Sequence, residues 1–206
     1  MGRPRGYDAD DLVDRAMTLF WRRGYAGTST SDLVEHLGVN KFSLYAEFGS
    51  KQALYEAALA RYDRDIVTGH FGRLESPAAG LGDILAVVDF FAESGRRPGS
   101  GNGCFLCNSA TERGADDPGT HAAVGAFFDR LRAACALALE NAWARGEVSA
   151  GVVVDEEAAW ITTTLIGLFV LMRAQADPTI LQQAGRAAQR HLNALRPAAT
   201  PDGALR

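Results

Sequence analysis

Glycines divide the first fifty residues into short segments whose apolar side chains recur at helical spacing. In residues 11–21 the apolar positions fall at i, i+4, i+7 and i+8, on one face of a helix; they are Leu12, Ala16, Leu19 and Phe20. Gly24 can close this helix with a left-handed cap. A second, short helix has its inner face on residues 33–37, and Gly38 supplies a tight turn before a third helix at Lys41–Phe48. The spacing predicts three helices, the last two joined by a glycine turn.

Two short helices joined in this way describe a helix-turn-helix, whose second helix lies in the major groove of DNA. Residues suited to N-caps stand where such helices must begin. Hydroxyls at 28–31 precede the second helix, Asn40 precedes the third, and Ser50 precedes a fourth that runs to about residue 67. The only lysines of the chain, Lys41 and Lys51, flank the third helix. That placement indicates a surface that binds phosphates.

Composition limits the class of protein. The net charge is −4, and residues 1–51 carry seven Lys/Arg and seven Asp/Glu, so no general basic coat surrounds the chain. The longest apolar run, residues 165–172, is far shorter than the roughly 20 residues that span a bilayer. We expect a cytoplasmic protein with no membrane partner. The three cysteines do not suggest a secreted disulfide scaffold.

The remainder of the chain has the patterns of helices and loops, so we predict an all-α fold. No strand pattern exceeds residues 152–154. A loop rich in Gly, Pro and Arg is expected at residues 96–103. We expect helices at residues 81–94, 104–113, 155–176 and 179–195, and another that starts with residues 116–118 and runs to about residue 145.

Residues 8–60 resemble the DNA-binding domain of the TetR (tetracycline-repressor) family. The resemblance lies in Ala16–Phe20, Gly24-Tyr25, Thr28-Ser29, Asp32–Val34, Leu37–Val39, Leu44-Tyr45, Phe48 and Ser50–Leu54. It implies a non-enzymatic regulator without a cofactor, usually a repressor, that binds a palindromic operator on double-stranded DNA as a homodimer. A small-molecule effector then releases it. The implied division is a helix-turn-helix domain at 1–51, a helical ligand-binding and dimerisation domain at 52–197, and a disordered tail at 198–206.

The resemblance assigns the DNA contacts residue by residue. Tyr45 and Lys51 match phosphate-binding positions, which set affinity and register but carry no sequence information directly. The start of the recognition helix, where base edges are read, holds Asn40, Lys41, Phe42 and Ser43. The start of the preceding helix, which touches the DNA backbone, holds Ser29, Thr30 and Ser31.

Two residues depart from the family pattern. Phe42 replaces a small residue, and an exposed aromatic there can contact a thymine methyl group. Its alternative role is packing in the small core. Glu47 replaces a common histidine; it accepts from a cytosine amino group, pairs with a cation, or is merely solvated.

The last two long helices are the expected dimer interface. Residues 155–176 are apolar nearly all round, which requires burial on more than one side. Small residues in 179–195 allow close approach of a second helix. The resemblance implies a four-helix interface between two copies, and the alternative is a monomer in which both helices join one core.

An effector site is expected in the C-terminal domain, with a neutral or weakly polar aromatic ligand. The candidate contacts are Phe91, Cys107, Asn108, Thr111, Phe128, Trp160 and Thr164. Each aromatic residue also suits plain core packing, because any helical domain buries such side chains.

Cys104 and Cys107 lie three residues apart on an expected helix, in its first turn, where the helix dipole favours a thiolate. A redox or electrophile sensor is one interpretation; two buried small apolar residues is the commoner one. A thiol redox enzyme would require a βαβ context, which is absent. A zinc site lacks a second ligand pair, so no metal is expected, and no catalytic constellation is present. A plain helical scaffold would leave the two lysines unexplained.

Overall fold

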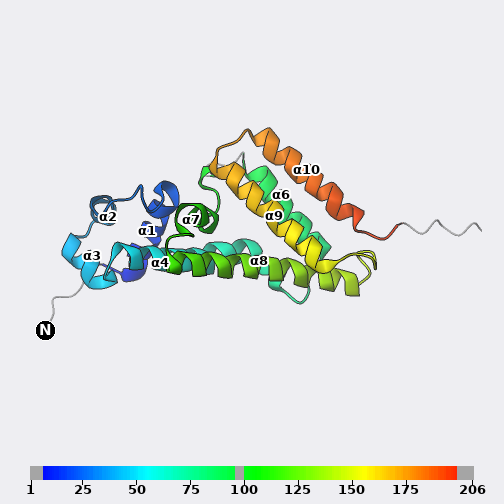
Figure 1. Ribbon diagram of the computed structural model, residues 1–206, viewed down its shortest axis with the longest axis horizontal. Coiled ribbons are helices and arrows are strands. Elements are labelled where there is room, and N and C mark those ends of the chain that lie inside the picture. The colour runs from blue at the N-terminus through cyan, green and yellow to red at the C-terminus, as the bar shows by residue number, and fades with distance from the viewer. Residues whose placement is uncertain (1–6, 96–99, 199–206) are drawn as a thin grey trace, which may run out of the picture. The chain divides into compact units, whose positions relative to one another are not determined.

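The computed structural model describes residues 7–95 and 100–198, and within these ranges it contains helices and no β-strand (Figure 1). The all-α prediction is confirmed. The α-helices are α1 (Ala9–Arg23), α2 (Thr30–Leu37), α3 (Lys41–Phe48), α4 (Lys51–Tyr62), α5 (Thr68–Phe71), α6 (Leu81–Ser94), α7 (Phe105–Arg113), α8 (Pro118–Ala144), α9 (Val154–Arg173) and α10 (Pro178–Ala194). Residues 96–99 of the predicted loop at 96–103, and the tail from residue 199 on, lie outside the described residues.

Contacts divide the chain into two compact units. The first unit contains the chain up to Gly69 together with Asn102–Phe127, and the second contains His70–Gly101 and the chain from Phe128 on. Helix α7 and the start of α8 therefore pack with the N-terminal helices. The predicted domains at 1–51 and 52–197 stay a prediction, because a unit of packing need not coincide with a functional domain.

The predicted caps of the first unit are confirmed. Side chains of Ser29, Asn40 and Ser50 accept hydrogen bonds from backbone N–H groups in the first turns of α2, α3 and α4. Gly38 has φ 69° and ψ 25°, the left-handed conformation that a glycine allows after α2. Gly24 differs from expectation: its φ of 76° is positive, but its ψ of 174° lies outside the left-handed helical region.

Helix α4 packs along α1 and continues, after Tyr62, as a π-helical segment at Asp63–Val67. Arg61 of α4 joins this helix to α1 by forming ion pairs with Asp10 and Asp14. The predicted fourth helix is thus continuous to residue 67, but its last turn is wider than an α-helical turn.

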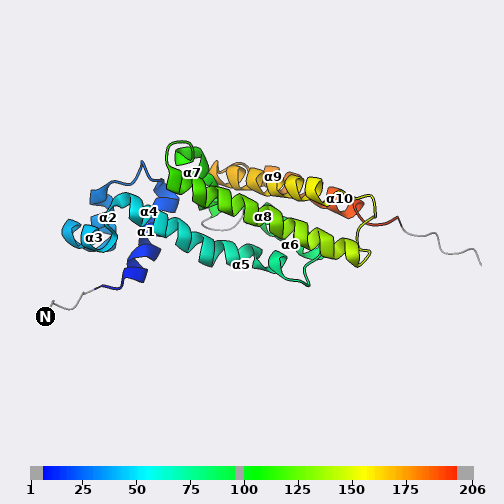
Figure 2. The same ribbon diagram turned by 60° about the horizontal axis from the view of Figure 1, so that its bottom comes forward.

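In the second unit, α6, α9 and α10 run side by side, as both ribbon views show (Figures 1 and 2). Close approach of α10 to α6 depends on Gly185, where an added Cβ would lie 2.2 Å from the Cβ of Ala92. Buried leucines and Phe169 fill the interior of this unit. Among the described residues, no helix combines the length and apolar character that crossing a bilayer requires.

Candidate DNA-binding site

Helix α3 is held by one buried side chain and presents polar residues around it. Leu44 is 1% exposed and anchors the helix, while Lys41 and Phe42 lie on the surface. Asn40 accepts from the Ser43 N–H at 2.8 Å, so the cap that starts the helix uses the side chain of a predicted DNA contact. This arrangement leaves the first turn of α3 accessible to a partner.

The beginning of α2 and the middle of α3 are joined by a hydrogen bond. The hydroxyls of Thr30 and Tyr45 lie 3.0 Å apart. The ammonium of Lys41 stands 5.9 Å from the centre of the Tyr45 ring. Three of the predicted DNA contacts therefore lie together, on two helices whose relative position is fixed by their own side chains.

The two departures from the family pattern have different surroundings. Phe42 is 83% exposed, so its alternative role in the small core is wrong. Contact with a thymine methyl group stays a prediction. Glu47 is half-buried, which excludes a fully solvated carboxylate.

Lys51 lies at the start of α4 and faces the loop between α1 and α2. Its ammonium donates to the carbonyl of Tyr25 at 2.6 Å and stands 3.9 Å from the centre of the Tyr25 ring. The Arg113 guanidinium lies 3.8 Å from the centre of the same ring. Burial lowers the pKa of Lys51, and the Arg113 cation lowers it further. The Glu112 and Asp32 carboxylates partly offset this lowering of the pKa, and a phosphate at this position would add a further anion that favours the charged lysine.

The same loop is held by a residue that sequence reasoning did not identify. The Glu112 carboxylate, at the end of α7, accepts from the N–H of Tyr25 at 3.0 Å and of Ala26 at 2.8 Å. It also lies against Gly24, where an added Cβ would be 2.7 Å from a carboxylate oxygen. Helix α7 thereby fixes the loop that leads into the helix-turn-helix.

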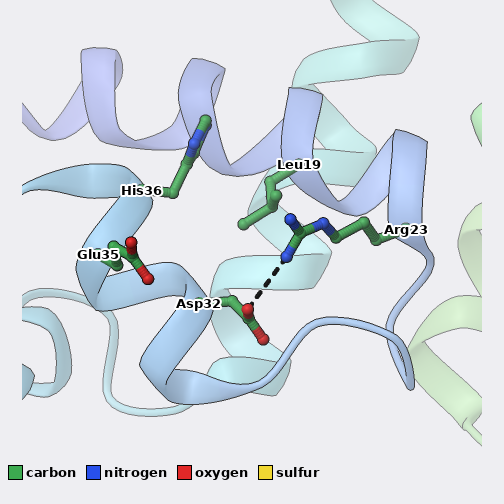
Figure 3. Close-up of a pocket in the computed structure, with 5 residues that line it drawn as sticks. All are labelled: Leu19, Arg23, Asp32, Glu35 and His36. Atoms are coloured by element: carbon green, nitrogen blue, oxygen red, sulfur yellow. Dashed lines mark hydrogen bonds and ion pairs between the residues drawn. The ribbon is translucent and has the colours of Figure 1, made fainter.

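A polar pocket of about 380 Å³ lies between α1 and α2 (Figure 3). Leu19 and Arg23 enter it from α1, and Asp32, Glu35 and His36 from α2. Arg23 and Asp32 form an ion pair of 3.0 Å across it. None of the predicted effector contacts lines this pocket, and its charged walls do not suit an apolar ligand.

Two family profiles match the chain in succession. The profile for bacterial regulatory proteins of the tetR family matches residues 12–58, which contain α2 and α3. The profile for the tetracyclin repressor-like C-terminal domain matches residues 80–188, more than half of the chain. The chain belongs to the TetR family. TetR regulators are transcription factors rather than enzymes, so the expectation of a non-enzymatic protein agrees with this membership.

Individual TetR relatives give the same result. The chain is 38% identical over 119 residues to the HTH-type transcriptional repressor ComR of Escherichia coli, covering 56% of this chain and 55% of ComR. It is 33% identical over 118 residues to the regulator YezE of Bacillus subtilis, covering 57% of this chain and 61% of YezE. The matches thus span little more than half the length of these relatives.

A solved structure covers nearly the whole fold. A cysteine mutant of the TetR family regulator CifR, in complex with 26-base-pair operator DNA, is 28% identical with a TM-score of 0.77. The match covers 92% of this chain and 98% of CifR.

The predicted effector contacts of this TetR chain fall in both packing units. Cys107, Asn108 and Thr111 belong to the first unit, where Asn108 donates to the carbonyl of Asn102 and Thr111 is exposed. The second unit contains Phe91, Phe128, Trp160 and Thr164. Phe91 is buried, with its ring centre 4.8 Å from that of Phe169 and 5.4 Å from that of Phe71.

Trp160 has different surroundings from Phe91. Trp160 is half-buried, and its ring centre lies 4.2 Å from that of His191 on α10. The His191 ring also contacts the Glu157 carboxylate. The structure therefore separates an interior aromatic cluster around Phe91 from an outer position at Trp160. Their role in effector binding stays a prediction.

Proposed function

We propose that this chain is a transcriptional repressor that binds a palindromic operator as a homodimer and is released by a small, neutral aromatic effector. The observation that carries the proposal is the accessible first turn of α3, with Lys41 and Phe42 exposed beside Tyr45. The repressor name of ComR and the operator complex of CifR support it. A protein that binds operators works where the chromosome is, so we propose a cytoplasmic location.

The homodimer is supported by the outer faces of α9 and α10. Val170 is 52% exposed and Ile180 is 46% exposed, although both are large apolar side chains. Several exposed residues on these two helices are small, namely Ala159, Thr163 and Gly167 on α9 and Ala187 on α10. Such a face suits close packing against the same face of a second copy, related by a two-fold axis.

The effector proposal is supported by the aromatic cluster of the second unit. Phe91 lies among Phe71, Phe90 and Phe169, with His70 at its edge. Aromatic walls with few polar groups are typical of sites for neutral ring-shaped ligands.

Selection of DNA from a random library by the purified full chain tests the proposed function. A two-fold symmetric protein is expected to select inverted half-sites whose centres lie about one helical turn, or a multiple of it, apart. Footprinting on the selected duplex then shows two protected half-sites. Selection of a single half-site, or of no preferred sequence, would contradict the proposal.

Lys51 and Lys41 are expected to act differently on the selected DNA. Lys51→Ala removes a phosphate contact, so binding to selected and random duplexes should weaken equally. The slope of log affinity against log salt should fall by about one unit per half-site. Lys41→Ala should instead change which bases are selected, if Lys41 reads a base edge. Titrations of the selected and random duplexes at several salt concentrations measure both effects. An unchanged salt slope in Lys51→Ala would show that Lys51 does not contact a phosphate.

A further inference from the structure

Three buried polar side chains meet where α7 begins, and the proposed DNA contacts include none of them. Cys104 is the N-cap residue of α7, and Cys107 is the third residue of the helix. Each is 5% exposed. The Cys104 sulfur lies beside the Cys107 thiol and the hydroxyl of Tyr62, the last residue of α4. All three residues belong to the first packing unit.

The backbone of Cys104 directs its side chain toward Cys107. Cysteines three residues apart inside a helix have Cβ atoms about 5–6 Å apart, whereas a disulfide needs about 3.5–4.5 Å. Cys104 is not inside the helix: its φ of −93° and ψ of 128° are extended. An N-cap side chain in this conformation turns over the first helical turn, toward the second and third residues. Cys107 is that third residue.

The surroundings of Cys104 favour a thiolate in spite of its burial. The Cys107 thiol, the Tyr62 hydroxyl and the N–H groups of Leu106 and Cys107 surround its sulfur and stabilise negative charge on it. Burial raises the pKa of the Cys104 thiol, but these donors outweigh it and hold the pKa below its usual value. The hydrogen bond to Cys104, with burial, raises the pKa of Cys107. The pair thus consists of one activated sulfur and one that keeps its proton.

We propose that Cys104 and Cys107 form a redox-active dithiol, which a small hydroperoxide converts into an intramolecular disulfide that weakens DNA binding. The inference rests on the proposed function as a DNA-binding regulator. Small uncharged oxidants suit this site because both sulfur atoms are almost fully enclosed. Bulky or charged thiol reagents do not fit the same enclosure.

The reaction balances with hydrogen peroxide as the oxidant. The Cys104 thiolate attacks one peroxide oxygen, the O–O bond breaks, and the departing hydroxide takes a proton to become water. Cys104 is then a sulfenic acid. The Cys107 sulfur, after losing its proton, attacks the Cys104 sulfur and displaces the sulfenic oxygen, which leaves as a second water. Two thiols lose two electrons to one peroxide.

A disulfide at this position changes the contacts that join α7 to α1 and α4. Tyr62 loses the thiolate beside its hydroxyl, and the buried phenol is left without that partner. The adjacent Gly103 carbonyl accepts from the Trp21 indole of α1 at 3.0 Å, and the Trp21 ring packs against Tyr62. At its other end, α7 holds the loop before α2 through Glu112. Displacement of α7 therefore reaches the helix-turn-helix.

The test uses the full chain, first fully reduced and then treated with hydrogen peroxide. Free thiols counted after denaturation should fall from three to one, and peptide mass mapping should find Cys104 joined to Cys107. Affinity for a duplex selected by the reduced protein should weaken by about tenfold or more, a usual size for coupling between two sites. Dithiothreitol should restore it.

Serine variants locate the effect. Cys104→Ser and Cys107→Ser should bind the duplex and resist peroxide, whereas Cys135→Ser is the matched control and should be released like the wild type. Cys135 is also buried, but it lies in α8 beside Thr162 instead of beside a second cysteine. If a serine variant does not fold, thiol counting and mass mapping on the wild type still decide whether the disulfide forms.

Three results would overturn the inference: three thiols remaining after peroxide, a Cys104–Cys107 disulfide with unchanged DNA affinity, or peroxide release that persists in Cys104→Ser. Failure of the reduced protein to select any DNA would instead contradict the proposed function. Formation of the disulfide, which thiol counting measures without DNA, distinguishes the two failures.

Discussion

Val170→Asp is expected to split the homodimer and to lower the affinity for a palindromic operator about a hundredfold or more. Val170 lies on the outer face of α9 and is 52% exposed, so the aspartate is solvated in a single chain. Across a two-fold interface the same change places two carboxylates in an apolar contact, where desolvation and repulsion both oppose association. Linking two half-site contacts commonly raises affinity by 10²–10⁴, and this gain is lost in the monomer.

Light scattering measures the molecular mass in solution, and anisotropy titration measures the affinity of the same sample. Ala133→Asp on α8 is a suitable control, because Ala133 is also exposed and belongs to neither of the two helices of the proposed interface. The control should stay dimeric and bind normally. A Val170→Asp protein that keeps the mass of two chains would place the interface elsewhere, and a monomer with undiminished affinity would separate dimerisation from operator binding.

The parts of the fold that local chemistry determines were predictable from the sequence. The bounds of α3 and α6 agree with their predicted ranges. For α3 the reason is visible, since the Asn40 side chain caps an N–H only three residues away. Cys104 was expected inside the helix rather than at its N-cap, because cysteine is not among the usual cap residues. Its conformation is set by tertiary packing around Tyr62 and Phe105.

The candidate site was predictable only where it lies within one motif. Thr30, Lys41 and Tyr45 come together because α2 and α3 are consecutive helices. Glu112 is separated by 87 residues from Tyr25, whose N–H donates to the Glu112 carboxylate. No spacing rule connects two such positions. The exposure of Phe42 was undecided for a similar reason, since an aromatic residue on a short helix fits either side until the neighbouring helices are placed.

Tyr55 lies at the centre of the first packing unit, and we expect Tyr55→Ala to lower the free energy of unfolding by about 3–5 kcal/mol. The side chain is fully buried, and its ring packs edge-on against Phe20 and Tyr25, each at 5.0 Å, and Phe105 at 5.5 Å. The free energy of unfolding of a domain is usually only about 5–15 kcal/mol. A loss of this size should therefore greatly increase the unfolded fraction of the first packing unit. Urea denaturation followed by circular dichroism measures it.

Tyr55→Phe is the matched variant, because it keeps the ring and removes only the hydroxyl, which lies 2.7 Å from the Ser109 hydroxyl. Ser109 still donates to the Phe105 carbonyl at 2.8 Å, so the cost near neutral pH should be only about 1 kcal/mol. Equal losses in Tyr55→Ala and Tyr55→Phe would mean that the hydroxyl rather than ring packing stabilises this unit.

The two proteins should also differ in alkaline solution. Burial raises the pKa of Tyr55 to about 12, from a usual value of 10.0. Between these values the unfolded chain loses the phenol proton while the folded chain keeps it, so the unfolded state binds fewer protons and stability falls as the pH rises. The wild type should therefore lose about 1.4 kcal/mol per pH unit between pH 10 and 12 relative to Tyr55→Phe. Parallel stability curves for the two proteins across this range would show that the Tyr55 hydroxyl is solvated, and that the aromatic cluster of the DNA-binding unit is less tightly closed than its geometry indicates.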